Sequence, residues 1–99
     1  CVMTAVVILG PVPDPGAAEA ERPRYVCIEK AQVTMVAAEI SELDWYVSSG
    51  EPMDKAGSYA LQAMGAALVE SVVGDPTTVI GLPLRSSIRL LRLAGVRWP

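Results

Sequence analysis

The chain has 99 residues, of which 52% are hydrophobic and 19% are charged, and this composition excludes an intrinsically disordered chain. The formal net charge of −3, without a broad basic surface, argues against a general nucleic-acid binder. The longest apolar run, residues 2–9, is too short to span a bilayer and lacks the flanks of a signal peptide. We therefore expect a soluble, cytoplasmic protein with neither nucleic acid nor membrane as a partner.

The first elements are expected to be two strands joined by a long connection. Residues 2–9 are rich in Val and Ile and predict a buried strand. Residues 10–24 contain four prolines, which exclude a regular element and predict a mobile loop. Residues 25–37 alternate imperfectly between apolar and polar positions, which predicts a strand covered on both faces over part of its length.

A short helix is expected over residues 42–48. Ser41 is predicted to be its N-cap, and Asp44 stands three residues on, in the capping-box position. Ser48-Ser49-Gly50 is expected to end it.

A second helix is predicted between Asp54 and Met64. Asp54 suits the positive end of its dipole, and Gly65 suits the position just after its last turn. The residues that recur at helical spacing are Ala56, Tyr59, Ala60, Ala63 and Met64.

The last part of the chain is expected to form a hairpin and a helix. Valines in residues 66–73 favour a strand, and residues 77–80 predict a second short strand after Gly74-Asp75-Pro76. Gly81-Leu82-Pro83 would end the hairpin. Residues 84–94 predict an amphipathic helix that ends before Gly95.

Few residues are available for chemistry. The sequence contains no phosphate-binding P-loop, dinucleotide fingerprint or nucleophile elbow. Cys1 and Cys27, without any histidine, cannot build an ordinary zinc site and are expected to be free, buried thiols. The candidates that remain are carboxylates, a lysine and a glutamine.

Lys55 and Gln62 are the first candidate pair. On the predicted helix they are seven residues apart, so they would share a face about 10 Å apart along the axis. A lysine attracts phosphate and a carboxamide both donates and accepts hydrogen bonds, which suits a nucleotide. An ordinary solvated helix face would have the same pattern.

Glu51 and Asp54 are the second pair. They could ligate a hard divalent metal or act as acid and base. Alternatively, Asp54 caps the helix and Glu51 is only solvated. On the last helix, Arg85, Arg89 and Arg92 form a basic stripe, which is also typical of a solvated face. Two further large residues, Trp45 and Trp98, are expected to be packing residues.

At this point the chain resembles a known family, the Maf nucleoside triphosphate pyrophosphatases. The resemblance is recognised in the stretch GEPMDKAGSYALQ and covers well over half of the chain, from about Val33 to Gly95. The residues that carry it are Gly50-Glu51-Pro52, Asp54-Lys55-Ala56-Gly57, Tyr59, Gln62, Gly65, Leu68-Val69-Glu70, Gly74-Asp75 and Val79-Ile80-Gly81-Leu82-Pro83.

The resemblance implies an α/β fold, namely the C-terminal half of a Maf/ITPase-like fold with an elongated mixed sheet flanked by helices. It implies hydrolysis of a nucleoside triphosphate to the monophosphate and pyrophosphate with a divalent cation, Mg²⁺ or Mn²⁺, as cofactor, and a house-cleaning role in nucleotide pools. Gln62 matches the dTTP/UTP-type branch and would help to select the base, Lys55 would bind substrate, and Glu51 and Asp54 would support them.

The sequence also departs from this family. The Ser-x-Ser-Pro-Arg-Arg loop and the Ala-Asp-Thr segment with the presumed base are absent, so the base is expected upstream of Cys1. Residues 1–99 are then a single partial domain, incomplete for catalysis and partnered by a missing N-terminal half or by a second copy in a homodimer. The alternatives are a non-catalytic half-domain that binds a nucleotide or a partner, and an α+β interaction module.

Overall fold

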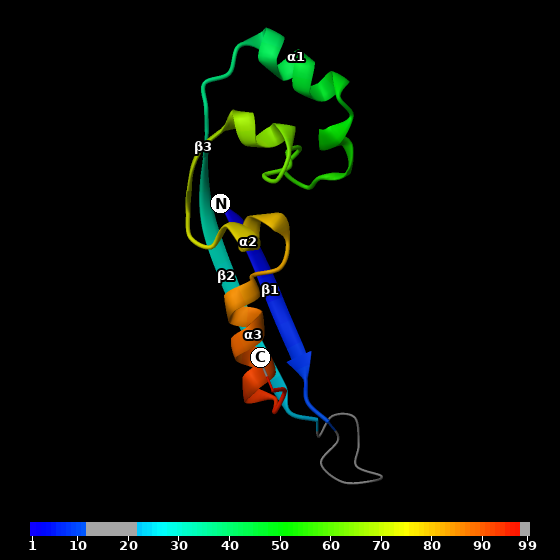
Figure 1. Ribbon diagram of the computed structural model, residues 1–99, viewed down its shortest axis with the longest axis vertical. Helices are drawn as coiled ribbons and strands as arrows, with labels where there is room; N and C mark the ends of the chain where they lie inside the picture. The colour runs from blue at the N-terminus through cyan, green and yellow to red at the C-terminus, as the bar shows by residue number, and fades with distance from the viewer. Residues whose placement is uncertain (12–21, 98–99) are drawn as a thin grey trace.

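The computed structural model describes residues 1–11 and 22–97 of an elongated molecule that measures 60 × 23 × 23 Å (Figure 1). None of the described helices combines the length and apolar character needed to cross a membrane. The elements, in chain order, are β1 (Val2–Leu9), β2 (Arg24–Met35), α1 (Ile40–Ser48), the 3₁₀ turns η2 (Glu51–Asp54) and η3 (Met64–Leu68), β3 (Val69–Val73), α2 (Pro76–Ile80) and α3 (Leu84–Leu93).

The described strands form one antiparallel sheet in the order β1-β2-β3. Val2 lies opposite Ala31 and Leu9 opposite Arg24, so strands are confirmed close to the predicted ranges, at residues 2–9 and 24–35. The burial expected for the first strand and the coverage on both faces expected for the second are wrong, because alternate residues are exposed, among them Val7, Val26 and Ile28. Both pairings are antiparallel, and a mixed sheet does not occur among the described strands.

The connection between β1 and β2 starts with a backbone hydrogen bond in which the Gly10 N–H donates to the Pro23 carbonyl at 2.8 Å. This bond continues the ladder past Leu9 because it joins the two strands where they leave the sheet. Most of the mobile loop expected at residues 10–24, namely residues 12–21, lies outside the described residues.

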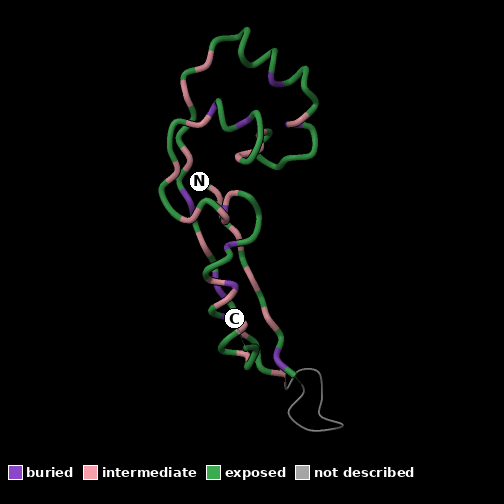
Figure 2. The backbone as a smooth tube through the Cα atoms, viewed as in Figure 1, coloured by how far each residue is buried: buried purple, intermediate pink, exposed green. Residues whose placement is uncertain are grey.

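The two faces of the β1–β2 ribbon differ in burial (Figure 2). On one face, α2 and α3 cover alternate residues, and Cys27, Ala31 and Leu90 are buried there. The Thr4 Oγ1 donates to the Thr78 carbonyl at 3.0 Å, which links β1 to α2. The other face, to which the intervening residues point, is apolar and exposed. Its exposed large side chains are Met3, Val7, Leu9, Val26 and Ile28.

The start of α1 differs from the prediction. The helix begins at Ile40 with Glu39 as its N-cap, and the capping box is completed by Glu42 rather than by Ser41 and Asp44. The Glu39 N–H donates to the Glu42 carboxylate at 3.2 Å. Carboxylates therefore serve both positions of the box, where the sequence pattern favoured a hydroxyl and an aspartate.

The α-helix predicted between Asp54 and Met64 is wrong. This part of the chain contains η2, an irregular segment over residues 55–63, and η3, which includes Gly65 instead of ending before it. Because η3 occupies residues 64–68, the strand predicted at residues 66–73 is shorter and is confirmed only as β3.

The second strand of the expected hairpin is also wrong, because residues 76–80 form the helix α2. The Asp75 carboxylate caps it by accepting from the Thr77 N–H at 2.9 Å, and Pro76 occupies its first turn. The final helix is confirmed as α3, followed by Gly95 at a positive φ.

Both described cysteines are free thiols. Cys27 is buried against the helical layer, as expected. Cys1 is exposed, so the prediction of burial is wrong for it.

Candidate functional site

A cavity of about 540 Å³ lies where the start of β1, the chain after η2 and the helix α2 meet. Its lining comes from residues 1–4, 54–57 and 78–81 together with Tyr59. Cavities of this size commonly hold small organic ligands. Three segments that are far apart in sequence therefore form one site around Lys55.

Lys55 is the cation of this cavity, and it is held by its neighbour Asp54. The Lys55 Nζ donates to the Asp54 Oδ1 at 2.7 Å, and the two side chains are 41% and 81% exposed. This hydrogen bond is the main cause that raises the pKa of Lys55 and lowers the pKa of Asp54. The lysine is thus charged at neutral pH, on a pair that remains open to solvent.

Gln62 is exposed and does not belong to the lining of the Lys55 cavity. The helix expected over these residues is absent, so the prediction that Lys55 and Gln62 share one helix face is wrong. Both residues instead belong to the irregular segment 55–63, which places Lys55 at its start and Gln62 near its end.

Glu51 is a hydrogen-bond acceptor for three donors rather than a solvated side chain. Its Oε1 accepts from the Tyr46 hydroxyl at 2.8 Å and from the Gly65 N–H at 2.9 Å. Its Oε2 accepts from the Met64 N–H at 3.2 Å. The Tyr46 oxygen in turn accepts from the Ala60 N–H at 2.8 Å. The expectation of a merely solvated Glu51 is therefore wrong.

The pKa values of Glu51 and Tyr46 follow from these hydrogen bonds and from burial. Desolvation raises the pKa of Glu51, but the hydrogen bonds from Gly65, Tyr46 and Met64 outweigh it, so the pKa lies below its ordinary value. Burial, followed by the hydrogen bond to Glu51, raises the pKa of Tyr46. At neutral pH the structure therefore pairs a charged carboxylate with a neutral phenol.

The carboxylates do not fit a divalent cation. Among the residues that the structure describes, no group of three or more His, Cys, Asp or Glu side chains is placed to hold a metal ion. Both oxygens of Glu51 accept hydrogen bonds from protein donors, and Asp54 is paired with the Lys55 ammonium. A cation site needs several free oxygens aimed at one point, and this pair does not supply it.

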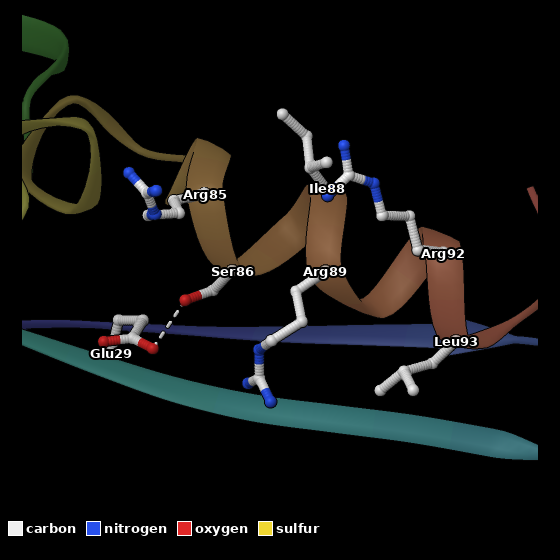
Figure 3. A pocket seen from close by; sticks show the side chains of 7 residues that line it. All are labelled: Glu29, Arg85, Ser86, Ile88, Arg89, Arg92 and Leu93. Carbon is white, nitrogen blue, oxygen red and sulfur yellow. Dashed lines mark hydrogen bonds between the residues drawn. The ribbon is translucent and has the colours of Figure 1, made fainter. Parts of the chain in front are cut away.

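A larger cavity, of about 850 Å³, lies beside α3 and includes the three predicted arginines, Arg85, Arg89 and Arg92 (Figure 3). The Ser86 hydroxyl donates to the Glu29 carboxylate at 2.6 Å, which attaches α3 to β2. Figure 3 shows that the guanidinium groups point in different directions instead of converging on one point. This arrangement is typical of a solvated basic face and not of a built anion site.

The packing role expected for Trp45 is only partly observed. Trp45 is half exposed, and the centroid of its ring lies 6.2 Å from that of the Tyr46 ring. Trp98 lies outside the described residues. Tyr46 is 3% exposed, and its hydroxyl donates a hydrogen bond to Glu51. No local pattern in the sequence signals that contact, because it joins a helix to the turn that follows.

Comparisons with known proteins agree on one family. The family described as "Maf-like protein" matches residues 1–94. A dTTP/UTP pyrophosphatase of Myxococcus xanthus is 43% identical over 84 residues, which are 85% of this chain and 43% of that protein. One of Bacillus pumilus is 37% identical over 78 residues, 79% of this chain and 41% of that protein.

A third dTTP/UTP pyrophosphatase, from Anaeromyxobacter dehalogenans, is 54% identical over 59 residues, 60% of this chain and 30% of that protein. The chain thus spans less than half the length of these curated relatives. Since the family match extends over almost all of its residues, the chain belongs to the Maf-like protein family.

Proposed function

We propose that the protein to which these residues belong hydrolyses dTTP and UTP to the monophosphate and pyrophosphate, as a house-cleaning enzyme of the cytoplasmic nucleotide pool. One observation carries the proposal: Lys55, the lysine of the Maf-like signature, lines a cavity of about 540 Å³. The relatives named dTTP/UTP pyrophosphatase supply the substrate class.

The roles of the residues follow from their chemistry. Lys55 binds the anionic phosphates, since an ammonium is a compact charge with three donors. Asp54 supports it by restraining the ammonium through their 2.7 Å contact. Gln62 selects the base, because its carboxamide can answer both the carbonyl and the N–H of thymine or uracil. Glu51 supports the segment that carries Lys55 and Gln62 by accepting hydrogen bonds from the Met64 and Gly65 N–H groups, which follow that segment.

Other parts of the proposal concern groups beyond these residues. The 99-residue chain is a single partial domain, the C-terminal half of a Maf/ITPase-like fold whose elongated mixed sheet continues in another segment. The catalytic base and the ligands of the divalent cation, Mg²⁺ or Mn²⁺, are then supplied by that N-terminal half, and a homodimer is a further partner to test. A half-domain that binds a nucleotide or a partner without hydrolysis is the alternative.

Gln62→Glu tests the proposal, with kinetics measured on the protein at its natural length. A carboxylate only accepts hydrogen bonds and would face a pyrimidine carbonyl with a negative charge. In this proposal the bound base covers Gln62, and one mispaired buried group costs about 1–3 kcal/mol, so kcat/KM for dTTP and UTP is expected to fall by roughly tenfold to a hundredfold. Gln62→Ala should lower it as well, but without the added repulsion.

A thermal melt of each variant serves as the control, because Gln62 is exposed and its replacement should leave folding unchanged. If dTTP turnover is the same in Gln62→Glu and the wild type, Gln62 does not contact the base. If the wild type binds dTTP without releasing pyrophosphate, the non-catalytic alternative is correct.

A further inference from the structure

The segment that carries Lys55 and Gln62, residues 55–63, is here called the signature loop. It contains neither helix nor strand, only turns, in one of which the Ser58 N–H donates to the Lys55 carbonyl at 3.0 Å. Ser58 also has a φ of 60°, an unfavourable region for a residue other than glycine. Such a loop keeps one conformation only if its surroundings hold it.

Tyr46 and Glu51 provide that support from outside the loop. The Tyr46 hydroxyl oxygen accepts from Ala60, inside the loop, while the Glu51 carboxylate accepts from Met64 and Gly65, directly after it. These contacts join residues 13 or 14 positions apart in the chain. The Tyr46–Glu51 hydrogen bond links the two supports into one unit at 2.8 Å.

The packing around this unit leaves no spare room. A Cβ atom added at Gly65 would lie 2.5 Å from the Tyr46 hydroxyl and 2.5 Å from the Ala60 carbonyl. Gly65 is not one of the glycines with a positive φ, so it is needed here for space. A charged acceptor, a buried phenol and a glycine thus converge on the C-terminal end of the loop.

Neither Tyr46 nor Glu51 lines the Lys55 cavity, whereas Lys55, Ala56, Gly57 and Tyr59 of the loop do. We propose that Tyr46 and Glu51 are positioning residues, which hold the signature loop so that Lys55 and Gln62 meet the nucleotide. The role rests on the proposed function, because it takes the ligand of the loop to be a nucleoside triphosphate. Hydrogen bonds to an ionised acceptor are about twice as strong as neutral ones, which suits a carboxylate to this task.

The test is Glu51→Gln, with Tyr46→Phe as a second variant that keeps the ring and its packing. Amide hydrogen exchange at Ala60, Met64 and Gly65 should accelerate in the first variant, and at Ala60 above all in the second. On the protein at its natural length, the KM for dTTP should rise by about tenfold in both variants while kcat changes less. Glu42→Gln is the matched control, since it makes the same charge change in the capping box of α1 and should alter neither readout.

The possible results separate the role from the proposed function. If exchange in the loop is unchanged, or if it accelerates while the KM for dTTP equals that of the wild type, then Tyr46 and Glu51 do not position the substrate-binding residues. If the wild type does not bind or cleave dTTP at all, the proposed function and the nucleotide as ligand both fall. The exchange data would still show, in that case, whether the pair holds the loop.

Discussion

Gly65 shows how much a single position can constrain this part of the molecule. Its neighbours, the Tyr46 hydroxyl and the Ala60 backbone, belong to other segments and are joined to each other by a 2.8 Å hydrogen bond. A methyl group at this position cannot be accommodated by one side chain moving aside, because the Ala60 atoms are backbone atoms. The constraint is therefore shared by the turn, the helix α1 and the loop.

Gly65→Ala is expected to lower the free energy of unfolding by about 1–3 kcal/mol, the usual cost of forcing an extra group into a filled site. Urea denaturation measures this difference. Gly57→Ala is the matched control, because the nearest atoms that a Cβ there would meet belong to the ring of Tyr59, at 2.9 Å, and a side chain can move aside. Equal effects of the two substitutions would contradict the role given to the packing around Gly65.

The lowered pKa of Glu51 leads to a prediction about how stability depends on pH. Its pKa in the folded state is below the ordinary value of 4.5, so an unfolded chain takes up the proton first as the pH falls. The stability that the charged form contributes is present above pH 4.5 and is lost as the pH falls through the pKa of the folded state. The stability difference between the wild type and Glu51→Gln should therefore shrink on acidification.

Urea titrations of both proteins at about pH 7 and about pH 3.5 measure that shrinkage. Asp54 and Asp75 also have lowered pKa values, but both variants contain them, so their contribution cancels in the difference. A stability difference that stays constant between the two pH values would show that Glu51 does not titrate against its donors as the structure indicates.

At the scale of elements, the sequence predicted what regular patterns can encode. The Val- and Ile-rich run in residues 2–9 and the amphipathic period in residues 84–94 appear in the structure as β1 and α3. The helix expected after Asp54 does not form. Its alanines have helical spacing, but the Ala60 N–H donates to Tyr46, which lies 14 residues earlier, instead of to a carbonyl one turn before. Single-sequence patterns do not reveal a partner so distant.

The helix α2 was missed for a local reason. The residues Thr77, Thr78 and Val79 are β-branched and favour a strand by propensity. Asp75 and Pro76, however, form a regular helix start, with the carboxylate accepting from the Thr77 N–H and the proline in the first turn. The capping signal was present in the sequence and outweighs the propensity of three residues.

The candidate site, like the fold, could be predicted from the sequence only in part. The signature that contains Lys55 and Gln62 could be recognised in the sequence, and the structure places Lys55 at a cavity. The contact between Tyr46 and Glu51 could not be predicted from the sequence. It depends on how the turn after α1 brings the Glu51 carboxylate to the Tyr46 hydroxyl. Residue types identified the candidates, and tertiary contacts decided what each one does.

The helix α3 provides a stability prediction of its own. Leu90 is 3% exposed beneath the helix, whereas Leu93, on the same helix, is 59% exposed. Leu90→Ala should lower the free energy of unfolding by about 2–5 kcal/mol, since it removes buried methyl groups and leaves a cavity. Leu93→Ala, the same change at an exposed position, should have a much smaller effect. Thermal or urea unfolding distinguishes them, and equal losses would mean that α3 does not pack on the sheet as described.

At the scale of the whole molecule, the described helices cover the β1–β2 ribbon on one face only. Val7 pairs with Val26 and Ala5 pairs with Ile28 across the ladder, so the exposed apolar residues are neighbours and form one patch. Val26 is 53% and Ile28 is 63% exposed. This patch fits the high apolar content of so short a chain, and contiguous apolar surface of this kind favours association.

The 99-residue chain is accordingly expected to self-associate through this face as its concentration rises. Replacing Val26 and Ile28 together by threonine should raise the dissociation constant by about tenfold or more, because burial of one such side chain stabilises by roughly 1.5–3 kcal/mol. The matched control replaces Val47 and Ile40 of α1, which are 59% and 76% exposed, by threonine as well. Sedimentation velocity at several concentrations measures the association. A wild type that stays monomeric at every concentration, or a control that weakens association equally, would show that the sheet face is not the surface through which the chains meet.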